Sequence, residues 1–212
     1  QIERVEHIIK VISETKPKGV QISIDTTKAN VAEAAINAGA EIVNDVSGGN
    51  DDPEIIEFCA DKQCPYIIMH MQGTPETMQN NPIYKNELLD IYDFFENKIK
   101  HLRSIGINHK NIIIDPGIGF GKNLKHNMNL IRGVSIFHSL GFPILVGNSR
   151  KRFIKDISKR NDSETRIGGT MASSIYLMMQ GIQILRIHDV NEAVSYTHLR
   201  AHETREDRVW GG

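Results

Sequence analysis

The apolar residues of this chain recur in two patterns, one typical of helices and one typical of buried strands. At the start, Ile2, Val5, Ile8, Ile9 and Ile12 recur every three or four positions, which predicts a helix with one apolar face. Elsewhere, short runs of branched apolar residues end at polar or glycine-rich turns, which predicts strands of a buried sheet. The strands expected are 20–26, 41–46, 65–70, 112–115, 143–149 and 184–189, and the later helices expected are 30–40, 53–58, 88–102, 125–140 and 164–180.

Strand and helix alternate strictly, which predicts parallel strands joined by helices. In an open α/β sheet, ligands bind where the strand order reverses, so only some strands need polar residues at their carboxyl ends. A closed barrel instead brings every carboxyl end to one rim, where its active site lies. Each predicted strand here ends in polar residues, which favours the barrel: Asp25, Asn44 and Asp45, His70, Asp115, Asn148 and Ser149, and Arg186 and His188.

The predicted fold is therefore an α/β (β/α)8 TIM barrel that is incomplete in this chain. About six βα units are visible, whereas a barrel has eight. Because the chain opens inside a helix, we expect the first two strands to precede residue 1. Residues 195–212 show almost no apolar face, so we expect a foreign tail after a barrel domain of residues 1–194.

Composition narrows the classes of protein. The 212 residues are 40% hydrophobic, which suits one globular domain, and the formal net charge of −1 argues against general nucleic-acid binding. No apolar run approaches the roughly 20 residues of a membrane span. Cys59 and Cys64 are too few for a disulfide framework, and we expect both to be reduced core residues.

The segment IIIDPGIGFGK at 112–122 predicts a cleft. A carboxylate, Asp115, ends a buried strand, and the glycines after it let a flat ligand or an anion approach the backbone. A Walker loop would need glycine where Pro116 stands, and a Rossmann fingerprint would need glycine where Lys122 stands. Neither nucleotide-binding motif fits.

The expected rim mixes acids with cations: Asp25, Asp45 and Asp115 with Lys122, Lys151 and Arg186. That mixture suits recognition of a polar molecule with an anionic group better than a metal cage. His70 is expected in a hydrogen-bond network, with metal ligation as the alternative. Residues i and i+2 of a strand share one face, so Arg186 and His188 are expected to grip one phosphate, with a salt bridge to a rim acid as the alternative.

The segment NSRKRF at 148–153 leads from a strand into a helix. Basic residues are unfavourable at a helix N-terminus unless an anion is bound. We therefore expect functional roles for Ser149 and Lys151, and with less support for Arg150.

Six ordered motifs resemble the dihydropteroate synthase family over residues 1–194: IDTTK, IVNDVSGG, MHMQGTP, DPGIGFGK, NSRKRF and RIHDV. The resemblance implies a cytoplasmic, homodimeric TIM-barrel transferase of folate biosynthesis that uses Mg2+ and is a sulfonamide target. It would condense 6-hydroxymethyl-7,8-dihydropterin diphosphate with 4-aminobenzoate, giving 7,8-dihydropteroate and diphosphate. Its partners would be these small molecules, with neither nucleic acid nor membrane.

Carried over to this sequence, the resemblance assigns Asp115 to the amino-pyrimidinone edge of the pterin, where a carboxylate can accept two parallel N–H bonds. The other pterin residues implied are Asp25, Asn44, Met71, Lys151 and Arg186. The aminobenzoate residues implied are Gly119, Phe120, Ser149 and Lys151, and those for diphosphate are Arg186 and His188. The catalytic residues implied are Asp25, Lys151, Arg186 and His188, in a dissociative mechanism without a side-chain nucleophile.

The chain departs from the family in two motifs that resemble NVTPDSFSDGG and GGESTRPG, and neither occurs here. The expected metal ligand belongs to the first, so no metal ligand is assigned in this chain. The alternatives are a pterin-binding methyltransferase domain, a non-catalytic pterin-binding protein, and an aldolase with a Schiff-base lysine. The last is disfavoured because Lys122 and Lys151 are expected to lack the apolar burial that depresses a lysine pKa.

Overall fold

The computed structural model describes residues 2–74, 76–158 and 166–195. The expected tail at 195–212 lies outside them except for its first residue, so the domain limit at 194 stays a prediction. The strands are β1 (Ser23–Asp25), β2 (Ile42–Asp45), β3 (Tyr66–Met69), β4 (Ile112–Asp115), β5 (Leu145–Val146) and β6 (Ile184–Leu185). The α-helices are α1 (Ile2–Thr15), α2 (Ala29–Asn37), α3 (Glu54–Lys62), α4 (Glu87–Ile105), α5 (Leu124–Gly133), α6 (Arg152–Ser158) and α7 (Ile167–Met179), with 3-10 helices at His109–Asn111 and Val134–Leu140.

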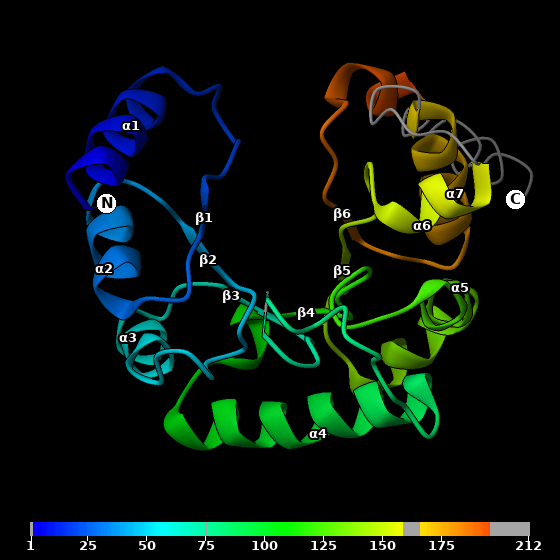
Figure 1. Ribbon diagram of the computed structural model, residues 1–212. Coiled ribbons are helices and arrows are strands. Elements are labelled where there is room, and N and C mark those ends of the chain that lie inside the picture. Colours follow the sequence, from blue (N-terminus) through cyan, green and yellow to red (C-terminus); the bar gives the residue numbers. More distant parts are fainter. Residues whose placement is uncertain (1, 75, 159–165, 196–212) are drawn as a thin grey trace, which may run out of the picture.

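All strand pairs of the described residues are parallel. β1 to β4 form one sheet in sequence order, and β5 pairs with β6 in a second. A single bridge between Ile114 and Ile144 joins β4 to β5, so the two sheets continue one arc. Figure 1 shows this arc with its helices on the outside and with β1 and β6 on opposite arms. The described chain is thus an open portion of the predicted barrel.

The apolar core lies between the strands and the outer helices. Val43, Tyr66, Ile68, Ile112 and Ile114 of the sheet are fully buried. They share one apolar cluster with helix residues Ile55, Ile91, Phe95 and Leu102. Burial of such side chains is the main favourable term in folding, and here it fixes the helices against the convex face of the arc.

Helix α4 closes the bottom of the arc (Figure 1) and buries one apolar face. Ile91, Phe95, Ile99 and Leu102 are buried, whereas Leu89 is half exposed. The side chain of Asn86 accepts hydrogen bonds from the backbone N–H groups of residues 88 and 89, which fixes where the helix begins.

Two further expectations change in detail, and one is confirmed. The helix expected at 125–140 tightens after Gly133 into the 3-10 helix Val134–Leu140. The backbone at Gly133 packs closely on Leu88, whose Cδ1 would lie 2.5 Å from an added Cβ. The strand expected at 143–149 pairs only over Leu145–Val146. Cys59 and Cys64 are free and buried, as predicted.

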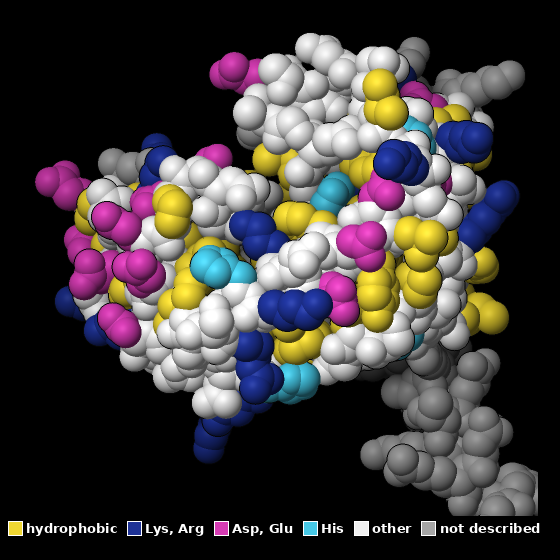
Figure 2. Space-filling view, turned by 90° about the horizontal axis from the view of Figure 1, so that it is seen from below, with side chains coloured by type: hydrophobic (Ala, Val, Ile, Leu, Met, Phe, Trp, Pro, Cys, Tyr) yellow, Lys and Arg dark blue, Asp and Glu magenta, His cyan; other side chains and the backbone are white. Residues whose placement is uncertain are grey.

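The face of the molecule seen from below carries charges of both signs (Figure 2). Seen from below, acidic side chains gather at the left of the view, while lysines and arginines are scattered among apolar and polar ones (Figure 2). Within the described residues, no helix has the length and apolar character needed to cross a membrane.

Phe95 tests the packing under α4. Its ring is fully buried and lies edge-on to Phe137, with ring centroids 5.8 Å apart. Phe95→Ala should lower the free energy of unfolding by about 3–5 kcal/mol, because it removes buried surface and leaves a cavity. Leu89→Ala on the same helix should change it by less than about 0.5 kcal/mol. Urea denaturation measures both, and equal effects would contradict the assigned face of α4.

Candidate functional site

Side chains from β1, β2, β4 and β6 converge at the carboxyl ends of the strands. Asp25 is the register partner of Asn44 on the neighbouring strand, and Asp115 ends β4. Arg186 follows β6, and its backbone N–H bonds to Val146. Its guanidinium lies 4.0 Å from Asp25 Oδ2 and 3.6 Å from Asp115 Oδ2, so it reaches acids from both arms of the arc.

Gly147 makes room for this guanidinium. A Cβ at position 147 would lie 3.1 Å from Nη2 of Arg186 and 3.2 Å from its Nε. That separation is tighter than nearly all real Cβ contacts. The guanidinium of Arg186 therefore packs directly against the backbone of the segment after β5.

Four buried atoms at this rim lack hydrogen-bond partners: Asn44 Oδ1, Asp115 Oδ2, Asn148 Oδ1 and Arg186 Nη1. Asp115 is 1% exposed, and its other oxygen accepts from the backbone N–H of Gly117 at 2.8 Å. Burial raises the pKa of Asp115, and the nearby Arg186 opposes that rise. Buried polar atoms without partners cost free energy, so this group indicates a ligand that supplies both donors and acceptors.

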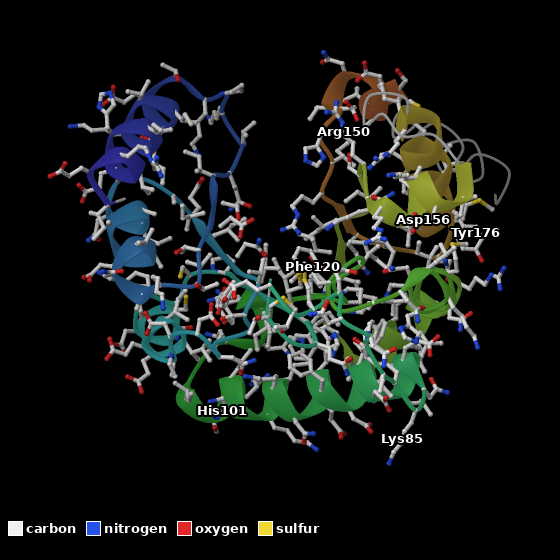
Figure 3. The ribbon with its side chains drawn as sticks, viewed as in Figure 1. Lys85, His101, Phe120, Arg150, Asp156 and Tyr176 are labelled. Carbon is white, nitrogen blue, oxygen red and sulfur yellow. The ribbon has the colours of Figure 1, made fainter. Side chains whose placement is uncertain are left out.

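Lys151 and the glycine-rich segment form the adjoining half of the rim. Lys151 Nζ lies 4.1 Å from the centroid of the Phe120 ring, a cation–π contact. A Cβ at Gly119 would lie 3.2 Å from Cδ of Lys151, so the backbone there borders the lysine stem. Burial lowers the pKa of Lys151. Figure 3 labels Phe120 near the middle of the arc.

Ser149 and His188 contact each other. Nδ1 of His188 lies 3.0 Å from Oγ of Ser149, and the backbone N–H of His188 donates to the same oxygen. Arg186 and His188 therefore do not share one strand face as predicted, because β6 ends at Leu185. For Arg186, the alternative of ion pairs with rim acids is the arrangement found.

Arg150 is more firmly placed than its sequence suggested. Its Nε and Nη2 donate to the two carboxylate oxygens of Asp189, and the hydrogen bond lowers the pKa of that acid. Its backbone is left-handed at φ 56°, and its N–H donates to Oγ1 of Thr170. This fork ties the segment after β5 to the segment after β6. In the sequence, Asp189 of the motif RIHDV was the one sign that Arg150 would have an acidic partner.

Asp45, by contrast, is not available to a ligand. Its oxygens accept from the N–H and hydroxyl of Ser47, the N–H of Gly49 and the hydroxyl of Tyr66. The expectation that Asp45 is a recognition acid of the rim is therefore wrong. The pattern of apolar and polar residues could not separate Asp45 from its neighbour Asn44, because the difference lies in long-range partners; only the family resemblance pointed to Asn44 alone.

His70 lies in a hydrogen-bond network, as predicted. Its Nδ1 is 3.0 Å from Nζ of Lys122, and its ring packs edge-on against Phe94. Burial and the nearby Lys122 lower the pKa of His70 to about 3. Met71, the next residue, is partly buried. The described residues contain no group of three His, Cys, Asp or Glu that could hold a metal ion.

Lys122 differs most from its predicted environment. It is 2% exposed, and burial lowers its pKa to about 7. The expectation that Lys122 and Lys151 lack the burial that depresses a lysine pKa is wrong. Lys122 Nζ instead contacts His70 Nδ1 and the carbonyl oxygens of His70 and Phe120, which leaves no unpartnered amine for a Schiff base.

A family model described as pterin binding enzyme matches residues 1–188. The chain therefore belongs to the family of pterin-binding enzymes, as its motifs predicted.

Within that family, the chain is similar to several dihydropteroate synthases. The enzyme of Synechocystis sp. is 41% identical over 189 residues, covering 89% of this chain and 65% of the relative. The enzyme of Escherichia coli K12 is 37% identical over 194 residues, covering 92% of this chain and 67% of the relative. The chain thus spans about two thirds of the length of these curated relatives.

Solved structures agree. The Yersinia pestis dihydropteroate synthase, solved with a sulfonamide drug complex, has a TM-score of 0.91 at 35% identity, covering 97% of this chain and 73% of that one. The Thermus thermophilus enzyme has been solved with 4-aminobenzoate, at a TM-score of 0.82, 33% identity and coverage of 92% and 72%. It has also been solved with 6HMPPP, at a TM-score of 0.83 and 33% identity, covering 93% of this chain and 75% of that one. The predicted TIM-barrel class is confirmed by these neighbours.

Gly117 tests the close packing at the cleft. Its φ is 69°, and a Cβ there would overlap the carbonyl oxygen of His70. Gly117→Ala should lower the free energy of unfolding by about 2–5 kcal/mol through backbone strain and overlap. Gly168→Ala in α7, where nothing lies within 4 Å, should be neutral or stabilising by up to about 1 kcal/mol. Thermal unfolding compares the two, and similar effects would refute this packing.

The pKa of His70 gives a pH test. Because the folded-state pKa lies below the unfolded value, the stability linked to neutral His70 is complete above about pH 6.5 and is lost as pH falls toward 3. His70→Gln should show a weaker decline of unfolding free energy over that range than the wild type. In NMR spectra, the wild-type His70 ring should not titrate between pH 5 and 8. A titration near 6.5 would contradict its burial.

Proposed function

We propose that this chain forms the pterin and aminobenzoate site of a dihydropteroate synthase, a transferase of folate biosynthesis. The reaction joins 6-hydroxymethyl-7,8-dihydropterin diphosphate to 4-aminobenzoate and releases diphosphate. The observation that carries the proposal is the set of unpartnered buried atoms on Asn44, Asp115 and Arg186, next to the Phe120–Lys151 pair. The relatives solved with 6HMPPP and with 4-aminobenzoate support small-molecule substrates of this kind.

Asp115 would read the pterin. Its Oδ2 is buried and has no hydrogen-bond partner, while Oδ1 is occupied by Gly117. A carboxylate in this state can accept N–H groups from an amino-pyrimidinone edge. Asn44 and Asp25 would take further pterin nitrogens, since they are register partners at the ends of β2 and β1. Met71 would pack on the ring.

The aminobenzoate would lie between the glycine-rich segment and Lys151. Gly119 and Phe120 supply a flat wall, and Lys151 lies over the Phe120 ring. Ser149 would meet the carboxylate end. A pterin-binding methyltransferase would need no second pocket of this kind, so the pairing of Phe120 with Lys151 favours the synthase.

The reaction would proceed by dissociation. The bond between the pterin methylene carbon and the diphosphate oxygen breaks, and its electron pair leaves with diphosphate, which Arg186 and His188 stabilise. The aniline nitrogen attacks the cationic methylene and then loses a proton to water. Asp25 would stabilise the developing positive charge, and Lys151 would orient the acceptor. Fixed charges and positioning would supply most of the rate.

Magnesium does not fit the described residues as a resident ion, because they offer no group of three metal-binding side chains. Mg2+ often takes one or two carboxylates together with substrate phosphates. An ion here would depend on the diphosphate for ligands, and none of the steps above uses one. Dimer formation and a cytoplasmic location remain predictions.

Asp115→Asn tests the proposal. Exchanging the carboxylate for an amide weakens two charge-assisted hydrogen bonds, so the pterin Kd should rise by about 100-fold. Asp61→Asn, an exposed site on α3, should leave it unchanged. Calorimetric titration with the pterin measures the Kd of each variant, and a coupled assay of diphosphate release measures its turnover.

In the wild type, diphosphate release should require 4-aminobenzoate. Turnover with methyl-tetrahydrofolate and a corrinoid, or release that ignores aminobenzoate, would rule out the synthase.

A further inference from the structure

The glycine-rich segment 117–121 is held from outside by side chains of other segments. Each of its last three carbonyl groups accepts a hydrogen bond from a side chain, and one N–H donates to another. A loop of glycines is flexible by itself, so these bonds fix a shape that the segment would not keep alone. They are Gln79 to Gly119 O (2.9 Å), Lys122 to Phe120 O (2.8 Å), Tyr84 to Gly121 O (2.8 Å), and Gly119 N to Asn127 Oδ1 (2.7 Å).

Lys122 differs from the other anchors because it is a basic side chain that is almost fully buried. Its Nζ lies 2.8 Å from the carbonyl of Phe120, 3.0 Å from Nδ1 of His70 and 3.3 Å from the carbonyl of His70. Burying a cationic group costs several kcal/mol. If this site needed only volume, a methionine would fill it at lower cost. The free-energy cost of burying Lys122 is therefore offset by the three contacts of its Nζ.

These contacts join two rim segments. His70 follows β3, and Phe120 lies in the segment after β4, so one nitrogen ties the two strand ends together. The Phe120 ring in turn lies under Nζ of Lys151, 4.1 Å from its centroid. A shift of the Phe120 backbone would therefore move the surface on which Lys151 rests.

We propose that Lys122 is a positioning residue for the aminobenzoate half of the site. Its Nζ holds the glycine-rich segment against the end of β3 and so keeps Phe120 under Lys151. Asp115 accepts from the N–H of Gly117, at the start of the segment, and faces Arg186 from β6. Among the nearby charges that lower the pKa of Asp115, that of Arg186 acts most strongly and that of Lys122 least, so we expect the pterin half to depend less on this brace. The inference rests on the proposed function.

The experiment measures the two ligands separately on the same protein. Pterin binding is measured with 6-hydroxymethyl-7,8-dihydropterin, and aminobenzoate binding is then measured with that pterin and inorganic diphosphate present. Lys122→Met should raise the Kd of 4-aminobenzoate by about 10-fold or more, the worth of a hydrogen bond to a charged donor. The Kd of the pterin should stay within about twofold.

Two further variants keep the test independent of one substitution. Lys122→Gln retains a donor and should fall between Lys122→Met and the wild type. Tyr84→Phe removes the neighbouring anchor to Gly121 O without burying a new group, and should weaken aminobenzoate binding by a few-fold. Lys16→Met is the matched control, because Lys16 also binds a backbone carbonyl, that of Val20, but at the other end of the strands.

Selective loss of aminobenzoate binding in these variants, with circular dichroism spectra like the wild type and an unchanged Lys16→Met, supports the inference. Unchanged aminobenzoate binding would overturn it, as would equal loss of both ligands, which a merely structural lysine would cause. If Lys122→Met does not fold, Lys122→Gln and Tyr84→Phe decide by the same comparison. A wild type that fails to bind the pterin would refute the proposed function itself, and this inference with it.

Discussion

The ion pairs of Arg186 organise this structure. A carboxylate as deeply buried as that of Asp115 is costly unless a positive charge lies near it. Arg186 supplies the strongest such charge from the end of β6, across the arc, while also approaching Asp25. The backbone of Gly147 lies against that guanidinium, and the oxygen of Asp115 that accepts no hydrogen bond faces it.

Much of this arrangement could be predicted from the sequence, because it depends on local patterns. The strand ends, the parallel order and the gathering of polar residues at one rim followed from alternation of apolar runs with helical periods. The partners of those polar residues did not follow. Asp45 and Asn44 are adjacent in the chain, yet only Asp45 has its oxygens filled by Ser47, Gly49 and Tyr66. Which side chains fill the oxygens of a rim acid depends on contacts made in the folded structure, and a single sequence does not show those contacts.

The glycines illustrate the same limit. From the sequence they indicated room for a ligand, but at Gly117 and Gly121 a Cβ would overlap backbone oxygens of His70 and Gln72. Those two glycines allow neighbouring segments of the protein to touch. Gly119, bordered by the stem of Lys151, is the one whose missing side chain widens the candidate site. The glycines of one motif therefore serve two purposes: two allow neighbouring backbone segments to pack closely, and one leaves space for a ligand.

The carboxylate of Asp115 has its counterion within the site. While Asp115 faces Arg186, the rim is close to electrically neutral, and neither a lone cation nor a lone anion gains the full attraction of its opposite charge there. A molecule with a neutral donor edge and a separate anionic group can engage both partners, because it takes the carboxylate at one end and the guanidinium at the other. A single ion pair thus selects for two features of one ligand at once.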